Sequence, residues 1–237
     1  MAIITKLISM MVSFIMMLLN LFGIGIDQRP EFVLGENVNS NAQEVLAVYN
    51  AAVIKTDEDA PLIESRMHIV DLTMGNGSGG TISFAKPLME DIFEETVYES
   101  YDIPGEGLLA ADDVISAKSS SENGWTTVII EVKDQVDGVN ADAYNGGPVS
   151  RAVGTLGDME AVFELIGFEC VSGKETIKFT YTDCTISCII DEATGEIIYG
   201  EWTFDVCATI GSAEFKMDEM VVEFEDLDAD FSYVATL

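Results

Sequence analysis

The stretch that decides the fold is IKFTYTDCTISCIIDEATGEIIYGEWTFDVCATIGSAEFKM, residues 177–217, in which apolar side chains recur at alternate positions. A period of two is typical of β-strands that bury one face in a core. The DEATG segment, Asp191–Gly195, supplies a tight turn between two such strands. We therefore predict an antiparallel meander. Its alternating apolar sets are Ile177, Phe179 and Tyr181; Ile186, Cys188 and Ile190; Ile198, Trp202, Phe204 and Val206; Phe215 and Met217; Met220, Val222 and Phe224.

A hairpin precedes this meander. Asn123–Gly124 is a strong two-residue turn signal, and it separates strand patterns at Val114–Ser120 and Trp125–Val132. The polar, Gly-rich run Asp134–Arg151 predicts a long surface loop, after which Asp158 can cap a short helix through Ile166. The residues expected to face the core on the second hairpin strand are Val128, Ile130 and Val132.

Two helices are predicted before the hairpin. Ser40 or Asn41, with Gln43 and Glu44 close behind, forms a capping signal for a helix over Asn41–Ile54. Its apolar positions are Val45, Val48, Tyr49, Ala52 and Val53.

A strand over Leu62–Met74 follows, and Phe84–Tyr101 shows the pattern of a second amphipathic helix. Helices gathered before a long meander indicate the α+β class. We predict a curved, half-barrel-like antiparallel sheet packed against one or two N-terminal helices, within an extracytoplasmic domain over residues 40–237.

The N-terminal segment Leu7–Ile26 contains no charged residue. Twenty residues of helix span about 30 Å, the thickness of the hydrocarbon core. We therefore predict a transmembrane anchor or uncleaved signal within residues 1–26 and a linker over 27–39, with cleavage as the open alternative. Lys6 before the segment favours a single-pass cell-membrane protein whose main domain is extracytoplasmic.

The composition excludes one class of partner. The chain has 42 acidic and 11 basic residues, a formal net charge of -31, which repels nucleic-acid phosphates. A strongly acidic surface can serve solubility alone. Weak binding of divalent cations is the alternative.

Four cysteines, Cys170, Cys184, Cys188 and Cys207, permit one or two disulfides in an oxidising compartment. Cys184 and Cys188 lie about 13 Å apart along a straight strand, so they cannot bond to each other there without a turn. Small buried thiols are the alternative, and the spacing matches neither redox nor zinc motifs.

No catalytic or cofactor motif is present. GxGxxG, Walker and GxSxG patterns are missing, so we predict no cofactor and no enzymatic activity. His68 is the single histidine and is expected to be structural. Asp226, Asp228 and Asp230 resemble the start of a calcium loop, but Phe231 stands where such a loop needs glycine. In a strand these three aspartates would share one solvated face, with weak divalent binding as an alternative.

Three segments carry a resemblance: NAQEVLAVYNAAV (41–53), LLAADDVISAKSSSENGWTTVIIEV (108–132) and YTDCTISCIIDEATGEIIYGEW (181–202). Together they resemble uncharacterised extracytoplasmic proteins of anaerobic Gram-positive bacteria. More distantly, the helix followed by a meander is similar to lipoprotein carriers of the LolA and LppX type. That resemblance implies a half-open barrel with an apolar cavity for acyl chains, although the acylation cysteine of the LppX branch is missing.

The resulting hypothesis is a non-enzymatic, membrane-anchored domain that binds an apolar ligand or lipid between sheet and helices. A cell-envelope interaction module with an acidic surface and a packed interior is the alternative, and a carboxylate-based hydrolase is a third. The apolar residues that suit either a cavity or an ordinary core are Phe84, Met89, Phe93, Trp125, Trp202, Phe204, Phe215 and Phe224.

Overall fold

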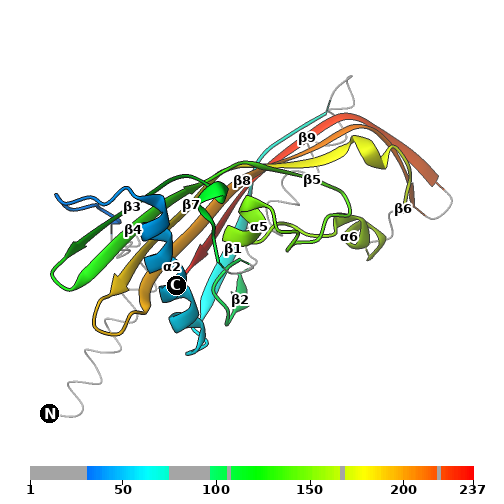
Figure 1. Cartoon of the computed structure of the whole chain (residues 1–237). Helices are drawn as coiled ribbons and strands as arrows, with labels where there is room; N and C mark the ends of the chain where they lie inside the picture. The colour runs from blue at the N-terminus through cyan, green and yellow to red at the C-terminus, as the bar shows by residue number, and fades with distance from the viewer. Residues whose placement is uncertain (1–30, 75–96, 106–107, 166–168, 218–219) are drawn as a thin grey trace, which may run out of the picture. The chain divides into compact units, whose positions relative to one another are not determined.

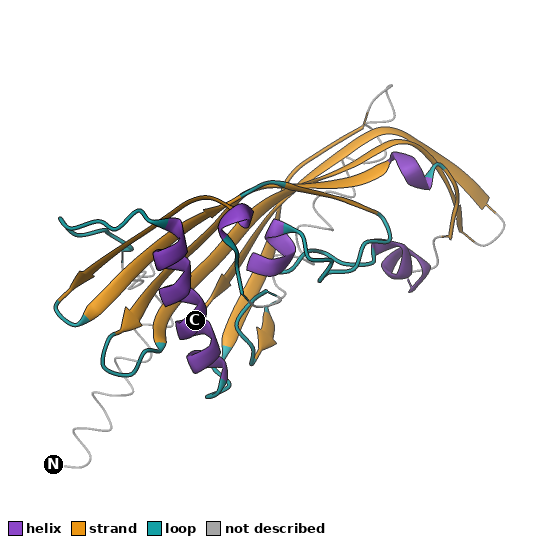
Figure 2. Ribbon diagram, viewed as in Figure 1, coloured by secondary structure: helices purple, strands orange, loops and turns teal. Residues whose placement is uncertain are grey.

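The structure is a computed structural model, and the residues that it describes are 31–74, 97–105, 108–165, 169–217 and 220–237. From Phe32 to Leu237 the chain forms one compact unit. This unit is an α+β fold with one large antiparallel sheet and few helices, as Figures 1 and 2 show. The predicted fold class is confirmed at this level.

The sheet contains nine strands within the described residues, and its main path is β2-β1-β9-β8-β7-β4-β3. β5 and β6 extend the sheet by pairing with β7 and β8, respectively. The strands are β1 (Ile63–Met74), β2 (Tyr98–Ser100), β3 (Val114–Glu122), β4 (Trp125–Val132), β5 (Gln135–Gly138), β6 (Glu169–Ser172), β7 (Ile177–Asp191), β8 (Ile197–Met217) and β9 (Met220–Thr236).

Helices pack on one face of the sheet, which we call the covered face; the opposite face is the open face (Figure 2). The helices are α2 (Ala42–Asp57), α5 (Pro148–Ala152) and α6 (Met159–Leu165), with 3-10 turns η1 (Ala111–Asp113) and η2 (Lys174–Thr176). The core lies between them and the sheet. It includes Trp202, Ile186, Val128 and Ile130, each 0% exposed.

α2 begins where the capping signal predicts. The side chain of Asn41 accepts a hydrogen bond from the Gln43 amide at 3.2 Å, which satisfies one free N–H of the first turn. Tyr49 then reaches the sheet, where its hydroxyl accepts a bond from the Trp202 indole at 3.0 Å. Val48 is a wrong prediction: its side chain is 43% exposed, and Leu46 is buried instead.

The meander is confirmed, but its strands are longer than the alternating sets suggest. The buried positions of β8 change from Trp202, Phe204 and Val206 to Ala213 and Phe215, so the alternation shifts by one residue between them. Asp226, at the same level of β9, has a φ of 48°. This left-handed residue lies where the alternation shifts, although the pairing of β8 with β9 keeps one register on both sides of it. Ile197 rather than the predicted Ile198 is buried at the start of β8.

The predicted β3–β4 hairpin is confirmed, with Asn123 and Gly124 at φ of 56° and 84°. Positive φ at both positions is the geometry of a type I′ turn. The predicted short helix after Asp158 is also confirmed as α6, and the Asp158 carboxylate accepts from the Ala161 amide at 3.1 Å.

Two other predictions need correction. The run 134–151 is not all surface loop, because it contains β5 and most of α5, with Gln135 and Ser150 buried. The predicted helix Phe84–Tyr101 is wrong at its end, where Tyr98–Ser100 pairs with β1 as a strand. Residues 84–96 of that prediction lie outside the described residues.

The predicted membrane segment Leu7–Ile26 also lies outside the described residues. Among the helices that the structure describes, none is long and apolar enough to cross a bilayer.

Candidate functional site

Aromatic side chains form a row across β7, β8 and β9 on the covered face. The Tyr181 ring meets that of Phe204 edge-on, with centroids 5.5 Å apart. Phe204 stacks on Tyr233 at 4.7 Å. These contacts follow the register, in which Phe204 lies opposite Tyr233 and Val206 opposite Phe231.

A second aromatic group lies farther along β8 and β9, beneath α6. Phe163 of α6 contacts the Phe215 ring edge-on at 5.4 Å, and Phe215 contacts Phe224 edge-on at 5.5 Å. These contacts dock the short helix on the sheet, where Figure 1 shows β8 and β9 bending around it.

Packing is less complete along β9 than beside α2. Ile210, Phe224, Phe231 and Tyr233 pack against the core but are only partly buried. We call these four residues the apolar strip. Along β9 it runs from position 224 to position 233, nine residue steps or roughly 30 Å at 3.3 Å per residue. Accessible apolar surface on a helix-covered face is the kind of surface that a greasy ligand uses.

The tyrosines of this face are uncharged at neutral pH. Burial raises the pKa of Tyr181 to about 12, and its hydroxyl accepts a bond from the Leu156 amide at 3.1 Å. Burial also raises the pKa of Tyr233, whose hydroxyl is hydrogen-bonded to Ser65. The face therefore offers apolar rings without a formal charge.

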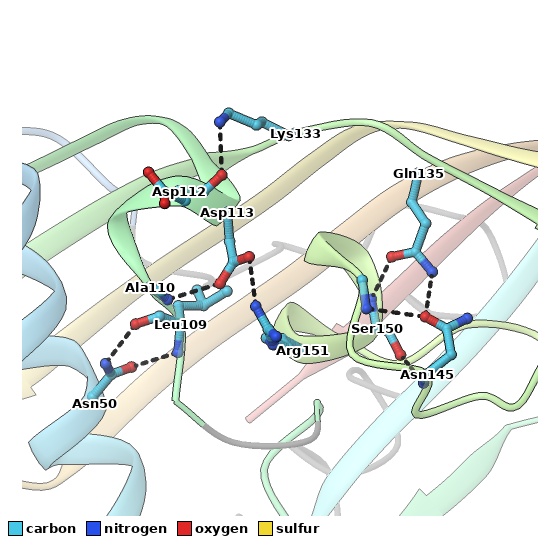
Figure 3. A network of polar contacts seen from close by, with 11 residues as sticks. Asn50, Leu109, Ala110, Asp112, Asp113, Lys133, Gln135, Asn145, Ser150 and Arg151 are labelled. Carbon is cyan, nitrogen blue, oxygen red and sulfur yellow. Dashed lines mark hydrogen bonds and ion pairs between the residues drawn. The ribbon is translucent and has the colours of Figure 1, made fainter.

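Figure 3 shows a polar network that fixes the segments crossing this face. Arg151 of α5 donates to the buried Asp113 carboxylate at 2.8 Å, and the other oxygen of Asp113 accepts from the Ala110 amide at 2.8 Å. Asn50 of α2 forms two bonds with the Leu109 backbone, at 2.9 and 3.1 Å. The network thus joins α2, η1 and α5.

A second part of the network holds α5 against β5. Gln135 accepts from the Ser150 amide at 3.1 Å and donates to Asp137 at 3.0 Å and Asn145 at 3.2 Å. The Ser150 hydroxyl donates to the Ala143 carbonyl at 2.6 Å. Because this hydroxyl bonds to backbone and not to a base, it is not arranged as an activated nucleophile. The network is structural.

An open pocket of about 280 Å³ lies where β5, η2 and the start of β7 meet. Its walls combine apolar side chains with two lysines and two carboxylates. The lining residues are Val136, Asp137, Gly138, Val139, Asn140, Lys174, Glu175, Ile177 and Lys178. This mixed lining differs from the apolar cavity that the sequence suggests.

The four cysteines lie at separate places and are not paired with one another in the structure. Cys184 and Cys188 are buried on β7, Cys170 is buried on β6, and Cys207 is partly exposed on β8 opposite Asp230. Burial raises the pKa of Cys184 and Cys207 to about 12 each, so these thiols are protonated and poorly nucleophilic at neutral pH. The predicted disulfides remain a prediction.

His68 and the three aspartates do not converge. His68 lies on the exposed side of β1, opposite Ser232. Asp228 and Asp230 lie on the open face opposite Thr209 and Cys207, but Asp226 sits at the break in alternation. Asp226 and Asp228 are exposed and Asp230 is partly exposed, so the prediction that the three share one solvated face stays a prediction. Within the described chain, no group of three or more His, Cys, Asp or Glu side chains could hold a metal ion.

The predicted cavity residues fall into separate groups. Trp202, Phe204 and Phe215 are core residues, and Phe224 belongs to the apolar strip. Trp125 is 54% exposed on the open face, so it cannot line a cavity on the covered face. The remaining three, Phe84, Met89 and Phe93, lie outside the described residues.

Sequence reasoning missed three residues of the strip, Ile210, Phe231 and Tyr233. The signal was present, because Phe231, Tyr233 and Ala235 continue the alternation of β9 beyond Asp230. Their partial exposure depends on how completely α5, α6 and the connecting loop cover the sheet.

Comparison of the chain with family models, curated proteins and solved structures produced no match.

Proposed function

We propose that the chain is a membrane-anchored protein whose extracytoplasmic domain binds an apolar molecule, such as a lipid acyl chain, on the apolar strip. In this proposal the domain binds without catalysing a reaction. The supporting observation is the contrast in packing between the covered face beside α2 and the partly buried residues along β9.

The chemistry of the strip suits an acyl chain. Phe231 and Tyr233 offer ring faces and edges, and Ile210 adds a branched aliphatic group. Burial of such surface contributes about 25 cal/mol per Å² of apolar area removed from water. A long, narrow strip therefore favours an extended apolar ligand over a compact polar one.

The fold type supports the same proposal. A bent antiparallel sheet with helices on one face is the arrangement that the resemblance to lipoprotein carriers leads us to expect (Figure 2). In the proposed half-barrel, the apolar strip would line the acyl-chain site. The anchor, Leu7–Ile26, would keep this site close to a source of lipid.

Native mass spectrometry of residues 32–237, purified without the apolar N-terminal segment, tests the proposal. We expect a bound lipid that is lost on denaturation and extracted by organic solvent. Ile210→Ser should reduce the bound fraction, because it places a hydroxyl on the strip. Ile115→Ser is the matched control, since Ile115 is 65% exposed on edge strand β3.

A clean apo mass from a protein that melts cooperatively would contradict lipid binding. So would equal ligand loss in the Ile210 and Ile115 variants.

A second candidate, an envelope interaction module, is favoured by the acidic open face. Asp205 and Asp228 are exposed there, and Asp230 is partly exposed beside them. Such a face fits a cationic partner. A clean apo mass together with salt-sensitive binding to a basic envelope component would favour this candidate.

A further inference from the structure

Two hairpins meet at one end of the sheet. The Glu192 amide donates to the Gly124 carbonyl at 3.0 Å, which joins the β7–β8 turn to the β3–β4 turn. The Thr126 hydroxyl reinforces this link by donating to the Glu192 carboxylate at 2.9 Å. We call this region, residues 123–126 and 191–195, the hairpin end.

Aromatic residues are exposed on the open face beside the hairpin end. Trp125 is 54% exposed and Tyr199 is 46% exposed. Ile189 lies between their strands, since it pairs with Thr127 on β4 and with Tyr199 on β8. The open-face patch consists of the exposed Trp125 and Tyr199 together with the partly exposed Ile129 and the buried Ile189 beside them.

The N-terminal side of the chain reaches the unit at this same place. Asn39 forms a β-bridge with Ser119 at the edge of β3. The Gly35 amide then donates to the Ser120 hydroxyl at 2.8 Å. Ser120 pairs with Thr127, which shares the open face with Trp125. Gly35 and Asn39 therefore contact β3 close to the patch.

The segment between the predicted anchor and this contact is short. Six peptide steps separate Ile26, the last residue of the apolar run, from Phe32, where the compact unit begins. At about 3.5 Å per residue they span at most roughly 21 Å. An anchor that ends at Ile26 would keep this end of the unit near the bilayer surface.

We infer that the open-face patch is a lipid-facing surface and that Trp125 and Tyr199 lie in the headgroup region of the membrane. The inference rests on the proposed membrane attachment. Tryptophan and tyrosine favour that region because one part of each ring is apolar and another can form hydrogen bonds. The nearby acids Glu122 and Glu192 oppose anionic lipids, so the surface fits zwitterionic lipid.

Quenching of tryptophan emission by brominated phosphatidylcholine tests the inference on the full chain in vesicles. The chain has two tryptophans, and Trp202 is 0% exposed, so a lipid quencher reports on Trp125. We expect brominated lipid to reduce the emission of the wild-type chain. Trp125→Phe should abolish that reduction.

A matched control moves the indole along the same face. Trp125 pairs with Asp191 and Val136 pairs with Thr180, so the two positions lie eleven residues apart along β7, roughly 36 Å. Val136 is 60% exposed. Val136→Trp in the Trp125→Phe background should therefore escape quenching.

Vesicle flotation separates the two ways in which the test can fail. A chain that does not float contradicts membrane attachment, and with it the proposed function. A chain that floats but shows no quenching of Trp125, or equal quenching of both tryptophan positions, overturns only the lipid-facing patch. Replacing phosphatidylcholine by phosphatidylglycerol should reduce quenching at low salt; unchanged quenching contradicts the choice of zwitterionic lipid.

Discussion

The ion pair between Arg151 and Asp113 is the contact on which the polar network most depends. The Asp113 side chain is only 7% exposed, whereas that of Arg151 is 39% exposed. Removing the arginine would leave a nearly buried carboxylate that still accepts a hydrogen bond from the Ala110 amide but has lost its ion pair. Arg151→Ala is expected to lower the free energy of unfolding by roughly 1–3 kcal/mol, as measured by urea denaturation.

The matched control for this variant is Lys55→Ala. Lys55 pairs with Glu58 at 2.8 Å, but their side chains are 44% and 62% exposed. Solvent screening should limit that loss to about 0.5 kcal/mol or less. Equal losses of stability in the two variants would show that the burial of Asp113 does not determine the loss of stability in Arg151→Ala.

Buried thiols and phenols predict a loss of stability at alkaline pH. The pKa of Cys184 and of Tyr181 is about 12 in the folded chain, above unfolded values of about 8.5 and 10. Since the folded state holds these protons more tightly, their contribution is complete below about pH 8.5 and is lost as pH rises toward 12. Cys184→Ala should flatten this decline in denaturation measured from pH 8 to 11. An unchanged slope would contradict the assignment.

Thiol reactivity tests the placement of the cysteines. Cys207 is partly exposed and the other three are buried, so Cys207 should react first with an aromatic disulfide reagent under native conditions. The number of thiols that react in denaturant distinguishes free cysteines from disulfides. Four reactive thiols would contradict the predicted disulfides. Two reactive thiols would support one disulfide, and none would support two.

At the scale of elements, Gly173 controls how β6 joins β7. It has a φ of 80°, and an added Cβ would overlap the Ser212 carbonyl oxygen on β8. Gly195 has a similar φ of 78° in the Asp191–Gly195 turn, but nothing lies within 4 Å of its added Cβ. Gly195→Ala should lower the free energy of unfolding by roughly 1 kcal/mol through backbone strain alone. Gly173→Ala should lower it by at least twice as much, as measured by thermal or urea denaturation. Equal losses of stability would contradict the role of Gly173 in joining β6 to β7.

The elements that local rules predicted well share one property. α2 and the β3–β4 hairpin are specified by a cap at Asn41 and by a turn at Asn123–Gly124, both of which act within a few residues. β5 and α5 were missed because a polar, Gly-rich run is typical of a loop. Gln135 and Ser150 are buried, and the Ser150 amide donates to the Gln135 side chain across fifteen positions of sequence, a contact that local rules do not anticipate.

At the scale of the whole molecule, the net charge of -31 opposes the folded state through self-repulsion. Added salt shortens the Debye length from about 30 Å at 0.01 M to about 10 Å at 0.1 M and screens that repulsion. The melting temperature should therefore rise with sodium chloride over this range. Calcium chloride at equal ionic strength should add no further increase unless the acidic residues form a divalent site, so a larger increase would support the weak-cation alternative.

The sequence by itself determined the elements that depend on short-range chemistry: the alternating meander, the hairpin turn, the capped first helix and the strongly acidic balance. Only the tertiary structure decided the phase shift near Asp226, the burial of Gln135 and Ser150, and the open face for Trp125. The apolar strip belongs with these. Periodicity places a side chain on one face of a strand, but its exposure depends on distant segments that pack over that face.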